Sequence, residues 1–176
     1  MNNMFQNVNF DVSYLKSYFA IFKDKAVVNR KDETRKVIQQ ATEELVCYFG
    51  HIPSDIDYIF NTLKNHLQNN PEVFATAFAF LPEILCSCPV VLRDNNGFKK
   101  KDIAKEFMYA SAVWYDVPVK QGKSVWSAPY FDIGKAGEDI LLTSYSVPVF
   151  DKNDKLIGVI ISDLLLARLE DIQKIE

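Results

Sequence analysis

Residues 140–162, ILLTSYSVPVFDKNDKLIGVIIS, decide the fold of this chain. Two runs rich in β-branched and apolar residues, Ile140–Phe150 and Lys155–Ser162, flank the polar segment Asp151–Asp154. Runs of this composition favour strands, and a short polar segment between two strands favours a tight turn. The stretch therefore predicts an antiparallel β-hairpin.

Further strand signals lie nearer the N-terminus. Val73–Leu81 is short, apolar and aromatic, and the β-branched run Val90–Arg93 precedes the turn Asp94–Gly97. The Asn-Gly step in that turn predicts a second hairpin. Residues 102–107 predict a helical turn. Residues 112–134 are rich in aromatic and turn residues, and they predict irregular structure with short strands.

Helical patterns lie on both sides of this region. Apolar residues recur at intervals of three and four over 11–28, over 32–49 and from residue 54 to about 69. A polar break at 29–31 separates the first two helices, and Ser54 with Asp57 resembles a capping box at the third. Leu164–Ile175 predicts a closing amphipathic helix.

The order of elements is helices, a mostly antiparallel sheet and a final helix, which is typical of an α+β domain. We expect a lead-in helical segment over residues 1–30 and a single domain over residues 31–176. The chain has 176 residues, of which 48% are hydrophobic and 24% charged, so it is large enough to bury one core.

Charge and hydropathy exclude several classes of protein. Twenty basic and 23 acidic side chains give a net charge of -3, without the cationic surplus that nucleic-acid binding requires. No run of about 18 apolar residues is present, and residues 1–10 lack the pattern of a signal peptide. Any membrane anchor is therefore expected outside this sequence.

The sequence also lacks the motifs of the common catalytic and metal sites. It has no nucleophile elbow, phosphate-binding loop or zinc-protease motif. Its two histidines, His51 and His66, are not at metal-ligand spacing to any of the three cysteines. We therefore predict no enzyme, no metal site and no cofactor.

Aromatic and acidic residues gather in the second half of the chain. They have the chemistry of an aromatic-walled pocket with polar groups that orient a ligand, although composition alone favours a packed core. Asp163 follows an apolar run, where a carboxylate needs hydrogen bonds or a partner, unless it caps the last helix. The candidate site residues are Trp114, Tyr115, Trp126, Tyr130, Asp132, Tyr145 and Asp163.

Three stretches together resemble the Cache family of extracytoplasmic sensor domains. They are NPEVFATAFAFLP (70–82), VWYDVPVKQGKSVWSAPYFD (113–132) and LLTSYSVPVFDKNDKLIGVIISDLLLARL (141–169). The resemblance covers about residues 32–175, and it is greatest to the Cache modules that precede bacterial serine phosphatases of the stress- and sporulation-regulator type. It implies a PAS-like (PDC-type) fold, in which a long N-terminal helix packs on a curved antiparallel sheet with a ligand pocket over it.

The resemblance also implies roles for particular residues. In amino-acid-binding Cache domains, an arginine two residues before the Trp-Tyr pair binds the ligand carboxylate, and this chain has Ala112 there. We therefore expect an amine-bearing or neutral polar ligand anchored by Asp163, unless Lys120 or Lys123 folds over the site. The residues that match pocket positions are Trp114, Tyr115, Tyr130 and Asp163.

These observations predict a ligand-binding sensory domain of a bacterial membrane signalling receptor, exposed on the extracytoplasmic face and coupled to an output domain outside this chain. The alternative is a scaffold or dimerisation domain whose vestigial pocket is filled by its own aromatic side chains. A homodimer through helix 32–49 is also expected, because Val37, Val46 and Phe49 lie off its apolar stripe. Residues 11–28 are an alternative cover for that surface.

Overall fold

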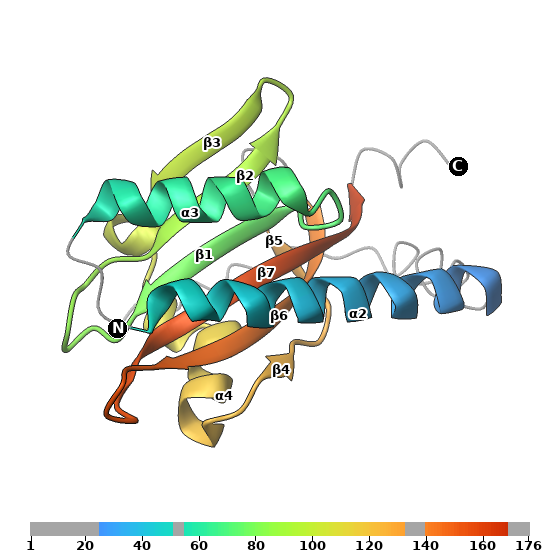
Figure 1. Ribbon diagram of the computed structural model, residues 1–176. Helices are drawn as coiled ribbons and strands as arrows, with labels where there is room; N and C mark the ends of the chain where they lie inside the picture. Colours follow the sequence, from blue (N-terminus) through green and yellow to red (C-terminus); the bar gives the residue numbers. More distant parts are fainter. Residues whose placement is uncertain (1–24, 51–54, 133–139, 169–176) are drawn as a thin grey trace, which may run out of the picture.

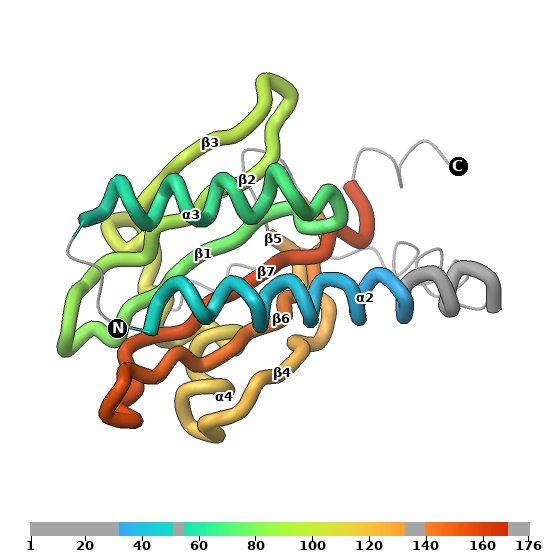
Figure 2. The backbone as a smooth tube through the Cα atoms, in the orientation of Figure 1, coloured from blue at the N-terminus to red at the C-terminus, as the bar shows by residue number. Residues whose placement is uncertain are grey.

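The computed structural model describes residues 25–50, 55–132 and 140–168, with side chains from residue 32 onward. Two helices, α2 (Lys25–Val46) and α3 (Ile56–Asn69), lie on one face of a seven-stranded antiparallel sheet. Helix α2 crosses β7 and β6, and α3 covers β1 and β2 (Figure 1 and Figure 2). The short helix α4 (Val113–Gln121) packs on β6 and β7 from the opposite face.

The sheet is built from two hairpins, strand β1 between them, and two short strands. Its order is β3-β2-β1-β7-β6-β4, and β5 also pairs with β6. The pairing confirms the predicted hairpins, because β6 pairs with β7 and β2 pairs with β3. The strands are β1 (Ala75–Phe80), β2 (Pro89–Asp94), β3 (Gly97–Asp102), β4 (Val125–Trp126), β5 (Tyr130–Asp132), β6 (Ile140–Phe150) and β7 (Leu156–Arg168).

Local signals explain both hairpin turns. The Asp151 carboxylate accepts hydrogen bonds from the amides of Asn153 and Lys155, at 2.8 and 2.9 Å, which closes the turn between β6 and β7. In the other turn, Asp94 pairs with Gly97 across two residues, and Gly97 has φ of +119°. A residue with a side chain rarely adopts that conformation, so glycine suits this position.

The two faces of the sheet carry side chains of different size. Strand β1 alternates between alanine on the α4 face and larger residues such as Phe78 and Phe80 on the α2–α3 face. Phe49, in the 3₁₀ turn Cys47–Phe49 after α2, stacks on Phe78 at 4.8 Å. The α2–α3 face therefore holds the large aromatic core, and the opposite face is left less filled.

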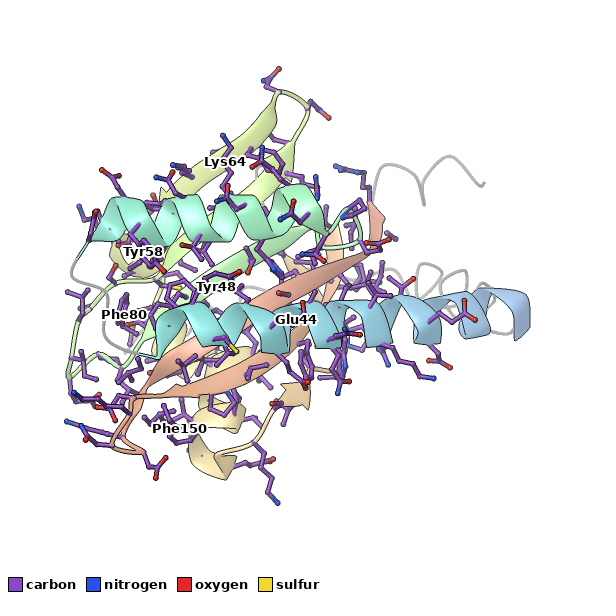
Figure 3. The ribbon with its side chains drawn as sticks, in the orientation of Figure 1. Glu44, Tyr48, Tyr58, Lys64, Phe80 and Phe150 are labelled. Carbon is purple, nitrogen blue, oxygen red and sulfur yellow. The ribbon has the colours of Figure 1, made fainter. Side chains whose placement is uncertain are left out.

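The ends of α2 and α3 are linked by a hydrogen bond. The Tyr58 hydroxyl of α3 donates to the carbonyl of Tyr48 at 3.3 Å, and both residues lie where the two helices approach (Figure 3). The described N-cap of α3 is Asp55, whose carboxylate accepts from the Asp57 amide at 2.8 Å. Ser54, the predicted cap, lies outside the described residues.

The structure corrects three predictions of secondary structure. Helix α2 continues through residues 29–31, so the predicted polar break is wrong; most of the predicted helix 11–28 lies outside the described residues. Residues 113–121 form helix α4 rather than irregular structure. Residues 164–168 continue strand β7, so a helix does not begin at Leu164, and residues 169–175 lie outside the described part. The division at residue 30 stays a prediction.

The physical reason for the last correction is long-range pairing. Leu164 and Leu165 pair with Thr143 and Leu142 of β6, and Arg168 pairs with Ile140. A run of leucines fits a buried helix and a buried strand equally well by periodicity, so tertiary pairing decides between them. Asp163 consequently lies inside a strand and is not the N-cap of a closing helix.

Candidate ligand-binding cavity

A cavity of about 680 Å³ lies on the face of the sheet opposite α2 and α3. Its floor is formed by strands β1, β2, β6 and β7, and its walls by the start of α4, the segment Ile103–Phe107 and residues 127–132. The floor residues are Ala75, Ala77, Val90, Leu92, Leu142, Ile161 and Asp163.

The cavity exists because the floor is made of short side chains under walls that stand away from it. Ala75 and Ala77 occupy the cavity-facing positions of β1, between larger residues on β2 and β7. Protein interiors are normally packed with few voids larger than a water molecule. An apolar cavity of this volume is therefore unusual for a packed core, and it is large enough to hold a small-molecule ligand.

Asp163 is the acidic group on the floor, and hydrogen bonds to its neighbours fix its position. Its cross-strand partner Ser144 donates to Asp163 Oδ1, with an O···O distance of 2.6 Å. The Tyr130 hydroxyl lies 2.8 Å from the same Ser144 Oγ. The Ser144 amide donates to Ser127 Oγ at 3.0 Å, which ties this cluster to the cavity wall.

Burial makes the charge of Asp163 costly. The pKa of this carboxyl is raised from 3.8 to about 7: desolvation is the main cause, the Ser144 hydrogen bond opposes it, and the Asp132 charge adds to it. Within the described part of the chain, no Lys, Arg or His forms an ion pair with Asp163. A cation brought into the cavity by a ligand would stabilise the ionised carboxylate.

The far end of the cavity has an ion pair that the sequence interpretation missed. Lys101 Nζ lies 2.6 Å from Glu106 Oε2, and both residues line the cavity. The predicted turn Asp94–Gly97 could have indicated this position of Lys101, because the hairpin that it closes pairs Lys101 with Val90. Neither of the two lysines that the sequence suggested, Lys120 and Lys123, lines the cavity. Lys120 forms an ion pair with Asp116 at 2.7 Å.

The structure brings four of the seven predicted site residues to the cavity. Trp114, Tyr130, Asp132 and Asp163 line it. Tyr115 does not, because its side chain turns into the core and its hydroxyl donates to the Phe80 carbonyl at 3.2 Å. Ala112, where the resemblance to amino-acid-binding Cache domains implies an arginine, lines the cavity.

The other two predicted residues, Trp126 and Tyr145, lie on the α2 face of the sheet and do not line the cavity. The Tyr145 hydroxyl donates to Glu43 Oε1 of α2 at 2.6 Å. The Trp126 ring lies 5.1 Å from that of Tyr145, and the Arg35 guanidinium of α2 stands 5.1 Å from its centroid. Successive residues of a strand point to opposite faces, which separates Tyr145 from its neighbour Ser144 on the cavity side of the sheet.

His66 is a titratable residue of α3 away from the cavity. Its side chain is buried, with Nε2 3.4 Å from Ser162 Oγ, and burial lowers its pKa from 6.5 to about 4 against the raising effect of Glu44. Among the described residues, no three His, Cys, Asp or Glu side chains are grouped to hold a metal ion.

Residues 59–171 match the family described as the first PDC sensor domain of methyl-accepting-chemotaxis-protein-like receptors. The extracellular domain described for the histidine kinase soHK1S-Z6 is 25% identical to the chain, with a TM-score of 0.70 over 92% of it. That of mmHK1S-Z2 is 20% identical, with a TM-score of 0.65 over 94%. No curated protein sequence matches the chain significantly.

The ligand-binding domain of the Campylobacter jejuni chemoreceptor Tlp3, in complex with L-valine, is 15% identical, with a TM-score of 0.61 over 92% of the chain. The chain covers 66%, 64% and 62% of these three domains, which is just under two thirds of their lengths. Among the described helices, none is long and apolar enough to cross a membrane.

Proposed function

The chain belongs to the family of first PDC sensor domains of methyl-accepting-chemotaxis-protein-like receptors, and from this premise we propose that it is the ligand-binding sensory domain of a bacterial membrane signalling receptor. The predicted Cache resemblance and fold are confirmed by the family and by the extracellular sensor domains of similar structure. The narrower resemblance to phosphatase-associated modules stays a prediction. In this proposal the domain lies on the extracytoplasmic face and has no catalytic activity of its own.

One observation carries the proposal: an apolar cavity of about 680 Å³ with a single desolvated carboxylate on its floor. A vestigial pocket would be filled by the domain's own aromatic side chains. Here Trp114 and Tyr130 line the space and leave it open. The cavity therefore favours a binding domain over a scaffold.

The charges around the cavity favour an amine-bearing or neutral polar ligand. A ligand ammonium at Asp163 would compensate the carboxylate's desolvation. A ligand carboxylate near Asp163 lacks a comparable partner, because Ala112 replaces the family's arginine and Lys101 is already bound to Glu106. L-valine, the ligand of the Tlp3 domain, has an ammonium group that fits such an anchor.

The route for a signal in this proposal runs through the sheet to α2. Ser144 contacts Asp163 on the cavity face, and the next residue, Tyr145, contacts Glu43 of α2 on the other face. A ligand that shifts Ser144 would therefore also shift the Tyr145–Glu43 contact. The ligand must bind one arrangement of α2 more tightly than the other for this movement to be a response.

The experiment is a thermal-shift screen of the chain at pH 8 with amines, amino acids and organic acids. A ligand that binds only the native state raises stability by RT ln(1 + [L]/Kd), about 2.7 kcal/mol at one hundred times Kd. Asp163→Asn should abolish the shift given by the best amine. Asp116→Asn removes a carboxylate from the same face at α4 and should leave that shift unchanged. Equal shifts in both variants would contradict the site assignment.

A homodimer through α2 is a second part of the proposal. Val37 is 47% exposed on α2, an unusual position for a valine on an amphipathic helix, and Tyr48 just beyond the helix is 59% exposed. Phe49, also expected at this surface, is fully buried in the core and does not contribute. A scaffold that only dimerises would share this surface and would give no shift in the ligand screen.

A further inference from the structure

The strand register shows how far the cavity extends from Asp163. Two neighbouring rows of residues face the cavity across the sheet. In one row Asp163 of β7 pairs with Ala75, and Ala75 pairs with Leu92. The other row runs, in register, through Ile161, Ala77, Val90 and Lys101.

The length of this floor is set by the spacing of strands. Asp163 on β7 and Lys101 on β3 are three strands apart, and neighbouring strands lie about 4.8 Å apart, so the floor spans about 14 Å. Its middle, on β1 and β2, is entirely apolar and has its shortest side chains at Ala75 and Ala77. Among the described lining residues, Lys101 is the only cation, at the far end and bound to Glu106.

We propose that the ligand is an elongated amine, with its ammonium at Asp163 and an unbranched apolar body that crosses β1 over Ala75 and Ala77 toward Val90. This inference rests on the proposed binding function and specifies its ligand class. A short polar molecule would leave the apolar floor beyond Ala75 exposed to water inside the cavity. An apolar chain of about six to eight carbon atoms covers the same floor and contacts Val90 and Leu92.

Ala77 is the specificity-determining residue in this arrangement. It lies in the row next to Asp163, between Ile161 and Val90, so a larger side chain there would fill the path of the apolar body. It does not pair with Asp163, which is opposite Ala75. A substitution at Ala77 should therefore shorten the chain that the cavity accepts and leave the ammonium position intact.

The test is a series of n-alkylammonium chlorides, from propyl to octyl, measured by isothermal titration at pH 8. Each buried methylene should tighten binding about fourfold, so hexylammonium should bind about sixtyfold more tightly than propylammonium. Hexanoate, the matched anion, should bind at least tenfold more weakly than hexylammonium. In Ala77→Leu the gain from propyl to hexyl should fall below about tenfold.

Ala110→Leu is the matched control, because Ala110 is exposed and does not line the cavity. It should keep the full gain from propyl to hexyl. Far-UV circular dichroism and urea unfolding check that Ala77→Leu folds, and Ala77→Val provides a smaller substitution if it does not. If propyl- and hexylammonium bind with equal affinity and Asp163→Asn abolishes binding, the proposal of an elongated ligand is wrong. The proposed binding function would still stand.

Three further outcomes are decisive. A chain-length gain that survives in both Ala77 variants overturns the position of the apolar body. Tighter binding of hexanoate than of hexylammonium overturns the polarity of the ligand. Failure of every ammonium to bind, or binding that Asp163→Asn leaves unchanged, overturns this inference together with the site on which the proposed function depends.

Discussion

Replacing Asp163 by Asn should stabilise the ligand-free domain at pH 8. The folded state raises the pKa of this carboxyl from 3.8 to about 7, a difference of about three units. Each unit corresponds to 1.36 kcal/mol, so ionising Asp163 in the folded state costs up to about 4 kcal/mol of the free energy of unfolding. Asn is neutral, and its amide oxygen still accepts the Ser144 hydrogen bond, so the variant avoids this cost.

The sign of the pH dependence follows from the direction of the shift. Between about pH 4 and pH 7 the unfolded chain has lost the Asp163 proton while the folded domain retains it. The contribution of Asp163 to stability therefore falls as pH rises through this window, and is at its lowest above pH 7. The variant and the wild type should have similar stability near pH 4 and should differ most at pH 8.

His66 has the opposite effect over an overlapping window. Its folded pKa is lowered from 6.5 to about 4, so its contribution to stability is lost as pH falls through that range. The two residues therefore change the free energy of unfolding of the wild type with pH in opposite directions. His66 is present in both the wild type and Asp163→Asn, so its effect cancels when the two free energies are subtracted. Replacing His66 by Gln should expose the downward slope of Asp163 alone.

The assay is urea unfolding at half-unit intervals from pH 4.5 to pH 8, followed by the fluorescence of Trp114 and Trp126. The difference in the free energy of unfolding between Asp163→Asn and wild type should grow with pH and then level off above pH 7. Parallel pH profiles for the two proteins would refute the reasoning, because they would mean that the folded domain does not perturb this carboxyl. A variant that is less stable at every pH would show that the carboxylate is needed for packing.

Three other predictions concern the α2 face and the sheet. Tyr145→Phe should cost about 1 to 2 kcal/mol in urea unfolding through loss of the Glu43 hydrogen bond. An amine should still bind, because Tyr145 does not line the cavity, with an affinity lowered by no more than the roughly thirtyfold that this hydrogen bond can couple. Gly158→Ala should lower stability by about 1 to 3 kcal/mol, because its Cβ would lie 2.5 Å from the Ala79 carbonyl oxygen; an unchanged thermal midpoint would contradict this contact. Val37→Asp should shift light-scattering mass from dimer to monomer, and a wild type that is monomeric at high concentration counts against the dimer.

The parts of the fold that were predicted correctly have local signals. The Asp151–Asp154 turn and the Asn-Gly step specify their hairpins through hydrogen bonds and backbone conformations within a few residues. Helix α4 has such a signal only at its end, where Gly122 adopts φ of +60°. Its sequence, VWYDVPVKQ, combines β-branched and aromatic residues with Pro118, all weak helix formers, and it is helical because Tyr115 and Pro118 pack against the sheet.

The candidate site was only partly predictable for a related reason. A cluster of aromatic residues in the sequence shows which side chains are available, and the strand register decides which face each one occupies. Trp126 and Tyr145 differ by one position from Ser127 and Ser144, and that single step places them under α2 instead of on the cavity side of the sheet. The pairing of Trp126 with Tyr145 between β4 and β6 sets this register, and nothing in the local composition indicates it.

The same alternation determines how a sensor of this kind would transmit a signal. Ser144 and Tyr145 are adjacent, so a backbone shift that adjusts the Ser144–Asp163 hydrogen bond also moves the Tyr145 hydroxyl relative to Glu43. The Tyr145–Glu43 hydrogen bond, whose acceptor residue is exposed, contributes about 1 to 2 kcal/mol, which corresponds to a five- to thirtyfold change in an equilibrium constant. If an ammonium binds more tightly when this contact is made, the coupling is large enough to shift the populations of two positions of α2. The ligand would not need to contact the helix. Loss of the ligand-induced change in hydrogen exchange of α2 in Tyr145→Phe, with ammonium binding weakened but still detectable, would identify this contact as the link.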